Sequence, residues 1–265
     1  MREITDLDEL KKIELDIMKH IHAFCEENDI KYVLCFGTLI GAVRHQGFIP
    51  WDDDIDIYMF REDYEKFKRL FPEYGQKHKL YIAASDTTPC LPRAMAKVCD
   101  ARTKLTEPNY QYSDDIGVFV DIWPLDGTPS SKIGRFFWNK KILFAHRLFY
   151  SGIEKDEYFQ GKGLKKVLRK LCKIIGPLKV EQYIEKKAHK YPVKSDRGVE
   201  CYSNKIRGFT YEEFNGRHLV KFEDVEFYIP DHYDSILEKI YGDYMKLPPK
   251  EQQIPHHVIN TFWID

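Results

Sequence analysis

The residues with the clearest chemical meaning are four carboxylates within five positions, in the segment GFIPWDDDIDIYM. They are Asp52, Asp53, Asp54 and Asp56. Two ionised carboxylates about 4 Å apart in a partly buried site repel each other by roughly 4 kcal/mol at an effective dielectric constant near 20. Such a cluster therefore persists only where water, bound protons or a cation offset the repulsion.

Two of these carboxylates alternate with apolar residues, which predicts a strand over 54–59 and disfavours full solvation. Asp54 and Asp56 are two positions apart, so they are expected to project from one face of that strand. Paired carboxylates of this kind suit the oxygen-seeking ions Mg²⁺ and Mn²⁺, which take further ligands from phosphates and water. The alternative for an isolated D-x-D is an acidic edge strand without chemistry.

Two further features favour a metal site. Gly37-Thr38 ends the apolar run IKYVLCFG and opens a helix over TLIGAVRH, a position where backbone N–H groups can face a phosphate. Asp121 lies in a second apolar strand, VFVDIW, where a lone carboxylate requires a partner or a metal. The combination predicts that Asp54, Asp56 and Asp121 are catalytic and hold divalent cations, with Gly37 and Thr38 on the substrate.

Other polar and aromatic residues near this cluster are candidate substrate contacts. Arg44 and His45 follow the glycine turn and suit phosphates, or alternatively a loop salt bridge with the neighbouring acids. Trp51 could stack on a base or enclose a quaternary ammonium, although core packing is the alternative. The predicted substrate-binding set is completed by Asp53 and Lys97. The adjacent His256-His257 is excluded as a metal pair because neighbouring side chains of an extended chain point apart.

Helices and strands of a mixed sheet must position these residues. An N-terminal helix with Asp6 and Glu9 at capping spacing is expected to run to about residue 27. Further expected elements are a helix over 61–70, strands over 80–85, 93–100 and 117–124, a hairpin over 220–229, and a last helix capped by Asp231 and closed by Gly242. This order predicts an α+β fold. We divide it into a catalytic core, 1–130, a basic helical insertion, 131–190, and a C-terminal hairpin and helix that pack back on the core, 191–265.

The charge is unevenly spread. The whole chain carries a net charge of −1, but 16 Lys or Arg stand against 5 Asp or Glu between Lys132 and Lys190. Such a surplus predicts an anionic partner, and a solvated helical face is the alternative. No apolar stretch of about 18 residues and no signal peptide is visible. The six scattered cysteines fit a reducing compartment. We therefore expect a cytoplasmic protein, peripheral at the inner face of the membrane, and no nucleic-acid partner.

Three segments resemble the LicD family: FGTLIGAVRHQGFIPWDDDID, VDIWPLDG and YGDYMKLPP. The similarity reaches from about residue 30 to residue 250. It implies a nucleotidyltransferase fold of the DNA polymerase beta type, with its Gly-Thr, D-x-D and third acidic residue at Gly37-Thr38, Asp54 and Asp56, and Asp121. Seventeen positions separate Gly37 from Asp54, which is longer than is usual in that superfamily. The intervening loop is therefore expected to be specific to this family.

The resemblance also implies an activity. Family members transfer a phosphate-linked group, phosphocholine in the best-known bacterial case, from a CDP-activated donor to a glycan hydroxyl and release CMP. The expected acceptor is a teichoic acid or a lipid-linked saccharide, and the expected cofactor is Mg²⁺ or Mn²⁺, with Asp121 as metal ligand or general base. The alternatives are a nucleotidyltransferase that releases pyrophosphate from a nucleoside triphosphate, and a non-catalytic choline- or glycan-binding protein.

Overall fold

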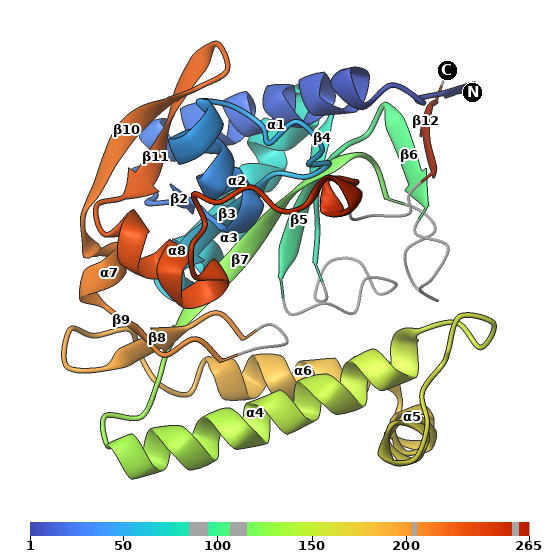
Figure 1. Ribbon diagram of the computed structural model, residues 1–265, viewed down its shortest axis with the longest axis vertical. Helices are drawn as coiled ribbons and strands as arrows, with labels where there is room; N and C mark the ends of the chain where they lie inside the picture. Colours follow the sequence, from blue (N-terminus) through green and yellow to red (C-terminus); the bar gives the residue numbers. More distant parts are fainter. Residues whose placement is uncertain (85–94, 107–115, 203–205, 256–259, 265) are drawn as a thin grey trace.

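The core of the protein is a mixed seven-stranded sheet, seen in a computed structural model that describes residues 1–84, 95–106, 116–202, 206–255 and 260–264 (Figure 1). Five strands follow one another in the order β2 (Val33–Leu34), β3 (Asp56–Phe60), β7 (Phe119–Gly127), β5 (Ala96–Asp100) and β4 (Leu80–Ala83). Only β3 and β7 pair in parallel on this path. Two short strands, β8 (Gly198–Glu200) and β9 (Phe209–Thr210), extend the sheet from the end of β7. The expected α+β architecture with a mixed sheet is confirmed.

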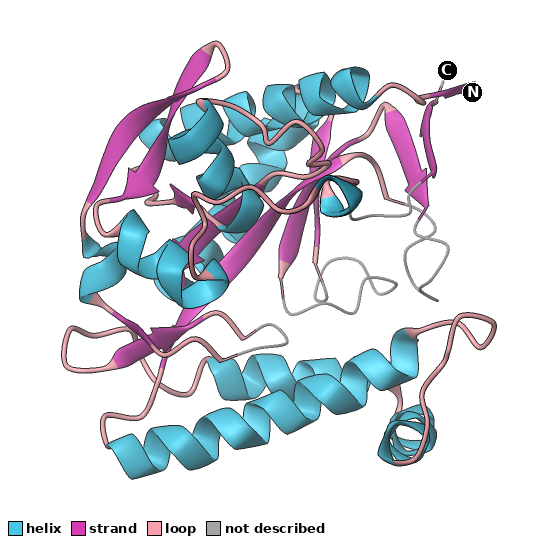
Figure 2. Ribbon diagram, in the orientation of Figure 1, coloured by secondary structure: helices cyan, strands magenta, loops and turns pink. Residues whose placement is uncertain are grey.

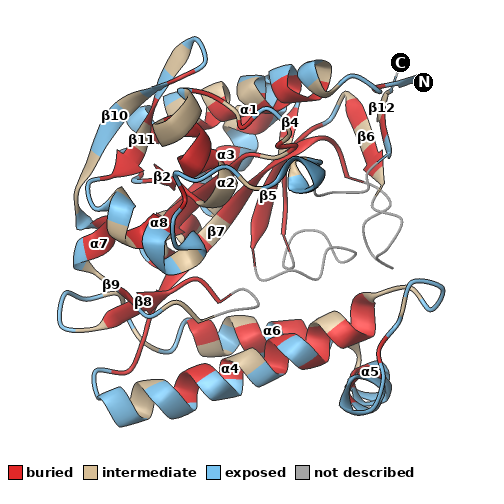
Figure 3. Cartoon of the chain, in the orientation of Figure 1, coloured by how far each residue is buried: buried red, intermediate tan, exposed pale blue. Residues whose placement is uncertain are grey.

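Two long helices pack against this sheet and against each other, α1 (Leu7–Glu27) and α3 (Arg61–Lys77). The α1 helix begins at the predicted cap, where the Asp6 side chain accepts a hydrogen bond from the Asp8 backbone N–H. Its apolar face meets α3 through edge-to-face contacts of Phe24 with Phe67 and Phe71. Buried residues concentrate on the central strands and on the inner sides of these helices (Figure 3).

The basic middle of the chain forms three helices: α4 (Lys132–Ile153), α5 (Leu164–Ile175) and α6 (Pro177–Ala188). They lie together below the sheet in Figure 2 and have a hydrophobic cluster of their own, which includes Trp138, Ile142, Phe149, Leu168 and Ile184. Arg61 at the start of α3 forms two salt bridges that connect this cluster to the sheet. Its Nε lies 2.7 Å from Asp126 Oδ1, and its Nη1 lies 2.8 Å from Glu185 Oε1 of α6. The domain limits at residues 130 and 190 stay predictions.

The C-terminal part returns to the sheet side. The hairpin of β10 (Arg217–Phe222) and β11 (Val225–Pro230) turns at Glu223-Asp224, as expected, and is followed by α8 (Tyr233–Tyr241), which ends at Gly242 with φ 73°. A small separate sheet places β12 (Asn260–Trp263) between β1 (Arg2–Glu3) and β6 (Thr103–Thr106), so the two ends of the chain meet. A 3₁₀ turn, Lys250–Gln252, follows α8, and α7 (Glu212–Asn215) precedes the hairpin.

Several predicted details are wrong. The β3 strand begins at Asp56, so Asp54 lies in the preceding loop, and Tyr58 is as buried as Ile57 because both faces of β3 are covered. The first helix after β2, α2 (Phe36–Ile40), starts before Gly37 and continues as the π-helical turn η1 (Gly41–His45). Asp231 does not cap α8, because its carboxylate hydrogen-bonds to His218 at 2.7 Å. The α3 helix runs seven residues beyond the predicted end, through Pro72.

The described cysteines agree with the expectation of small apolar fillers. Cys25, Cys35, Cys99, Cys172 and Cys201 are all buried and free of disulfides. Cys90 and the excluded pair His256-His257 lie outside the described residues.

Candidate active site

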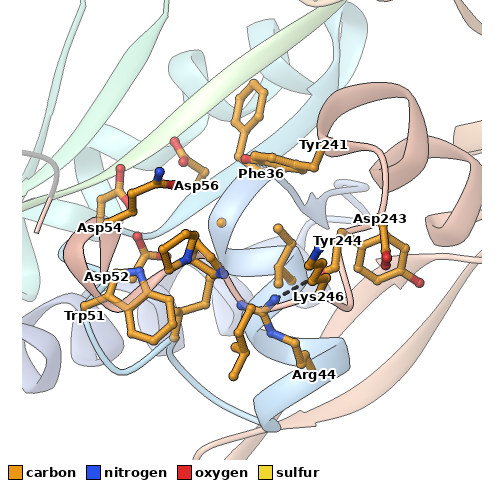
Figure 4. Close-up of a pocket in the computed structure, with 17 residues that line it drawn as sticks. Phe36, Arg44, Trp51, Asp52, Asp54, Asp56, Tyr241, Asp243, Tyr244 and Lys246 are labelled. Atoms are coloured by element: carbon orange, nitrogen blue, oxygen red, sulfur yellow. Dashed lines mark hydrogen bonds between the residues drawn. The ribbon is translucent and has the colours of Figure 1, made fainter. Parts of the chain in front are cut away.

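A pocket of about 550 Å³ opens between the acidic loop, the α2 helix and the segment that follows α8 (Figure 4). The acidic loop, residues 51–55, contributes Trp51, Asp52 and Asp54 to one wall, and Asp56 at the start of β3 continues this wall. Facing them across the pocket are residues of the segment YGDYMKLPP, which lies nearly 200 positions further along the chain. The lining residues from this second side are Tyr241, Asp243, Tyr244, Lys246, Leu247, Pro248 and Pro249. Two of the segments that resemble the LicD family therefore form opposite walls of one pocket.

The backbone at Asp56 is held by hydrogen bonds on both sides. Its N–H donates to the Thr38 hydroxyl at 2.9 Å, and its carbonyl accepts from the Cys35 N–H at 3.0 Å. Thr38 is only 2% exposed, so its side chain positions Asp56 and does not reach the pocket. The contact of the Gly37-Thr38 backbone N–H groups with a substrate phosphate stays a prediction. The Gly-Thr pair and the D-x-D segment occur together for a structural reason, because the Thr38 hydroxyl fixes the backbone of Asp56.

The Asp56 carboxylate is 7% exposed and accepts a hydrogen bond from the Trp123 indole N–H at 2.7 Å. Burial raises the pKa of Asp56 well above its usual range, and the negative charges of Asp54 and Asp121 raise it further. A buried carboxylate beside two others is stabilised by a proton or by a cation. This carboxylate lines the pocket, so a cation bound there would replace the proton.

Asp121 has a different environment. It is the register partner of Asp56 on β7, and its Oδ1 accepts a hydrogen bond from the Lys97 ammonium at 2.5 Å. Lys97 is 0% exposed, sits opposite Asp121 on β5, and has its Nζ 3.1 Å from the centroid of the Phe119 ring. The predicted contact of Lys97 with substrate phosphate does not fit a fully buried side chain. Lys97 instead supplies the positive charge that Asp121 requires inside the sheet.

The acidic loop also contains a cluster of three carboxylate side chains. One oxygen from each of Asp52, Asp53 and Asp54 lies within 4.8 Å of the others. Asp52 and Asp53 are buried, whereas Asp54 is half-buried and lines the pocket. Asp53 does not line the pocket, and its contact with substrate stays a prediction. All these donors are carboxylate oxygens, which fits a hard divalent cation and not a soft one.

One acidic residue near this loop was missed by the sequence analysis. Glu14 of α1 is 3% exposed, and its Oε2 has no hydrogen-bond partner among the described residues. Burial raises the pKa of Glu14 well above its usual range, and the charges of Asp54, Asp53 and Asp52 add to the effect. The signal in the sequence is that Glu14 falls between Leu10 and Ile17 on the core-facing side of an amphipathic helix.

Arg44 connects the two walls of the pocket. Its Nη1 donates to the Tyr244 carbonyl at 2.6 Å, and its Nε donates to His45 Nε2 at 2.9 Å. Neither of the two predicted alternatives, phosphate binding or a salt bridge with the acids, describes this arrangement. Arg44 lines the pocket and tethers the segment after α8, whereas His45 does not line the pocket. Burial lowers the pKa of His45, as does the adjacent Arg44 charge.

The remaining predicted residues line the pocket. A Cβ at Gly37 would lie 2.6 Å from Asp52 Oδ2, so glycine is required for this close approach. Trp51 lines the pocket and also packs on the main core, so its position is compatible with both predicted roles, substrate contact and core packing. Two further residues, Tyr241 and Lys246, were missed by the sequence analysis because they come from the far end of the chain.

Comparisons with known proteins agree with this geometry. Residues 29–159 match the family profile described as "LicD/FKTN/FKRP, nucleotidyltransferase domain". The chain is 35% identical to the lipopolysaccharide cholinephosphotransferase LicD of Haemophilus influenzae, over 99% of both chains. The chain belongs to the LicD family. More distant relatives are the uncharacterized protein RT0683 of Rickettsia typhi, 32% identical over 70% of this chain and 66% of its own, and the human ribitol 5-phosphate transferase FKRP, 28% identical over 40% and 19%.

As a member of the LicD family, the chain is an enzyme of the LicD phosphotransferase type. The family profile covers the acidic loop, Lys97 and Asp121, but it excludes Glu14 and the wall formed by residues 241–249. The match to the Haemophilus protein spans these parts as well. Among the helices in the described ranges, none is long and apolar enough to cross a membrane.

Proposed function

We propose that this LicD enzyme transfers phosphocholine from a CDP-activated donor to a hydroxyl of a cell-surface glycan and releases CMP, with Mg²⁺ or Mn²⁺ as cofactor. The observation that carries the proposal is the row of carboxylates, Asp52, Asp54 and Asp56, along one wall of a pocket large enough for a nucleotide-linked donor. The near full-length similarity to a lipopolysaccharide cholinephosphotransferase supports the transferred group and the glycan acceptor. The expected nucleotidyltransferase-like fold accords with the description of the matching family profile.

The residues that would hold a divalent cation are Asp54 and Asp56, with Asp52 beside them. A bound cation would offset charge on the phosphate oxygens and lower the pKa of the acceptor hydroxyl. Asp121 accepts the Lys97 hydrogen bond at Oδ1 and supports the cluster from the neighbouring strand, and its roles as metal ligand or general base stay predictions. The Oε2 atom of Glu14, which has no hydrogen-bond partner among the described residues, also fits a region in which a bound cation would offset the carboxylate charges.

Aromatic residues from several sides of the pocket suit the donor. Phe36, Trp51, Tyr241 and Tyr244 provide this lining, and aromatic faces together with carboxylates attract a quaternary ammonium. This combination favours phosphocholine over a polyol phosphate. Lys246 lies in the wall formed by residues 241–249, where its ammonium can pair with a phosphate.

The transfer follows from this arrangement. The acceptor oxygen attacks the phosphorus that bears the choline, and a new P–O bond forms while the P–O bond to CMP breaks, the two oxygens lying in line. The acceptor proton passes to a carboxylate of the cluster, and the diphosphate charge leaves on CMP. Catalysis here consists of positioning and of charge stabilisation.

The test is CMP release from a panel of CDP-choline, CDP-ethanolamine, CDP-ribitol and CDP-glycerol, with saccharide acceptors and with Mg²⁺, Mn²⁺ or EDTA. CTP is included, because pyrophosphate release would identify a nucleotidyltransferase. We expect CMP from CDP-choline only, in the presence of metal only, and a loss of at least about 10³-fold in Asp54→Asn. Asp224→Asn, an exposed carboxylate at the β10–β11 turn, is the matched control and should retain full activity.

Each outcome has a distinct meaning. CMP released from another CDP donor would overturn the choice of phosphocholine but not the chemistry. CMP released equally with EDTA, or by Asp54→Asn, would overturn the metal site. Binding of choline or glycan without turnover of any donor would indicate a binding protein.

A further inference from the structure

Exposed apolar side chains gather on the basic helices. Of 19 large apolar side chains that are exposed in the described part of the chain, 11 lie between residues 133 and 183. They are Ile133, Phe136, Phe137, Phe144, Tyr158, Leu164, Val167, Leu171, Ile174, Ile175 and Tyr183. Contiguous exposed apolar surface of this kind marks an interaction site.

The α5 helix carries the clearest apolar stripe. Its outward apolar residues recur at helical spacing and are 70%, 62%, 40%, 73% and 39% exposed, in the order Leu164, Val167, Leu171, Ile174 and Ile175. Packing in the three-helix cluster accounts only for Leu168 and Cys172. The apolar side of α5 is therefore wider than the part that packs against the neighbouring helices. About half of this apolar side is exposed to solvent.

The outer side of α4 is similar. Ile133, Phe137 and Phe144 share one helical face with Lys140, and they are 74%, 67% and 52% exposed. Phe136 beside them is 57% exposed. The opposite face of α4, with Trp138, Ile142 and Phe149, is buried in the helical cluster. In Figure 3 the exposed side of α4 points away from the sheet.

Positive charges occupy the other side of the α5 helix. On α5 the side opposite the stripe carries Lys165, Lys166, Lys170 and Lys173, all of them exposed. The segment 132–190 contains 16 basic and 5 acidic residues, so two copies of this surface would repel each other. Self-association is therefore disfavoured, and the partner must combine an apolar interior with a negative surface.

We propose that the outer faces of α4 and α5, called the α4–α5 surface, bind to a bilayer that contains anionic lipids. Interfacial helices insert Phe, Leu and Ile side chains into the acyl boundary while lysines remain at the headgroups. Each lysine near an anionic surface adds to the attraction. No helix in the described ranges crosses a membrane, so the contact is along the bilayer plane. The catalytic pocket is formed by other elements, and the two functions are separable.

The experiment is flotation of the purified full chain with vesicles of phosphatidylcholine alone or with 30% phosphatidylglycerol, at low and high salt. We expect binding to the anionic vesicles, and a strong decrease at high salt. Val167→Ser/Ile174→Ser should weaken binding by roughly tenfold for each side chain that no longer inserts. Lys166→Glu/Lys170→Glu should weaken it by roughly 20-fold or more.

Matched controls separate this surface from general effects. Leu70→Ser/Leu219→Ser removes two exposed apolar side chains on other elements and should bind as the unmodified chain does. Lys12→Glu/Lys221→Glu changes the net charge equally, at exposed positions outside the helical segment, and should have little effect. Asp54→Asn should float normally even if it is inactive, so a failure of the proposed activity leaves this test unaffected.

Three results would overturn the proposal. The first is a chain that binds neither kind of vesicle. The second is binding that is equal on both kinds of vesicle and is unchanged by the lysine substitutions. The third is a chain that forms dimers in solution which Val167→Ser/Ile174→Ser dissociates, because this would assign the surface to a second copy.

Discussion

Asp56 and Asp121 are register partners on the parallel strands β3 and β7, but their carboxylates receive hydrogen bonds from different donors. Asp121 accepts from the Lys97 ammonium, and Asp56 accepts from the neutral Trp123 indole. Within the sheet, the Lys97 ammonium therefore offsets the negative charge of Asp121, one of the two adjacent acids. The other acid lines the pocket, and the hydrogen-bond donors described for its carboxylate are neutral. This is where the proposed cation would bind.

Asp56→Asn should stabilise the protein in the absence of metal. Burial and two neighbouring carboxylates raise the pKa of Asp56, so its ionised form opposes folding, whereas an amide carries no charge and can still accept the Trp123 hydrogen bond. We expect Tm to rise by about 2–4 °C for each kcal/mol of repulsion removed. Stabilisation by Mg²⁺ should be lost at the same time.

Calorimetry with and without Mg²⁺ measures both effects. Asp224→Asn, whose carboxylate pairs with Lys19 at the surface, is the control and should not raise Tm. A lower Tm for Asp56→Asn, with stabilisation by Mg²⁺ intact, would contradict the placement of the cation at Asp56.

Lys97→Met should be among the most destabilising substitutions in the sheet. It leaves the Asp121 carboxylate buried without its cation, which costs about 3–5 kcal/mol. The double variant Lys97→Met/Asp121→Asn removes both charges and should recover most of that loss in urea unfolding. Lys77→Met breaks an exposed pair with Glu73 and should cost less than about 1 kcal/mol. Equal stabilities of the single and the double variant would show that Lys97 does not act through Asp121.

Thr38→Val should lower both stability and activity. The substitution keeps the shape of the side chain but leaves the buried N–H of Asp56 without an acceptor, which costs about 1–3 kcal/mol. Because Thr38 does not line the pocket, we expect kcat to fall more than KM rises. Thr38→Ser retains the hydroxyl and should behave nearly as the unmodified chain does. A larger effect on KM than on kcat would return Thr38 to the substrate-binding residues.

His146 should make the protein sensitive to mild acid. Burial lowers the pKa of His146 to about 4, and neither ring nitrogen has a hydrogen-bond partner among the described residues. The unfolded chain takes up a proton below about pH 6.5 and the folded chain does not, so stability is complete above that pH and declines as the pH falls toward 4. The loss amounts to roughly 3 kcal/mol.

Urea unfolding between pH 4 and 7 measures this loss. His146→Phe should flatten that part of the profile. A profile for His146→Phe that is as steep as that of the unmodified chain would show that another group is responsible.

Local patterns were enough to predict much of this protein. The helical spacing of apolar residues predicted α1, α3 and the three basic helices, and the period-two pattern predicted the hairpin. The D-x-D segment with its preceding glycine predicted the pocket wall that contains Asp54 and Asp56. These features depend on neighbours within a few positions, where side-chain direction follows from the backbone period alone.

Only the tertiary structure decided which distant residues meet. The pairing of Lys97 with Asp121 depends on the register of β5 against β7, and a shift of one residue would turn Lys97 to the other face. Glu14 joins the acidic loop because α1 crosses the sheet there, and Arg44 reaches Tyr244 across 200 positions of sequence. Spacing along the chain carries no information on such contacts, because they depend on how separate elements pack in three dimensions.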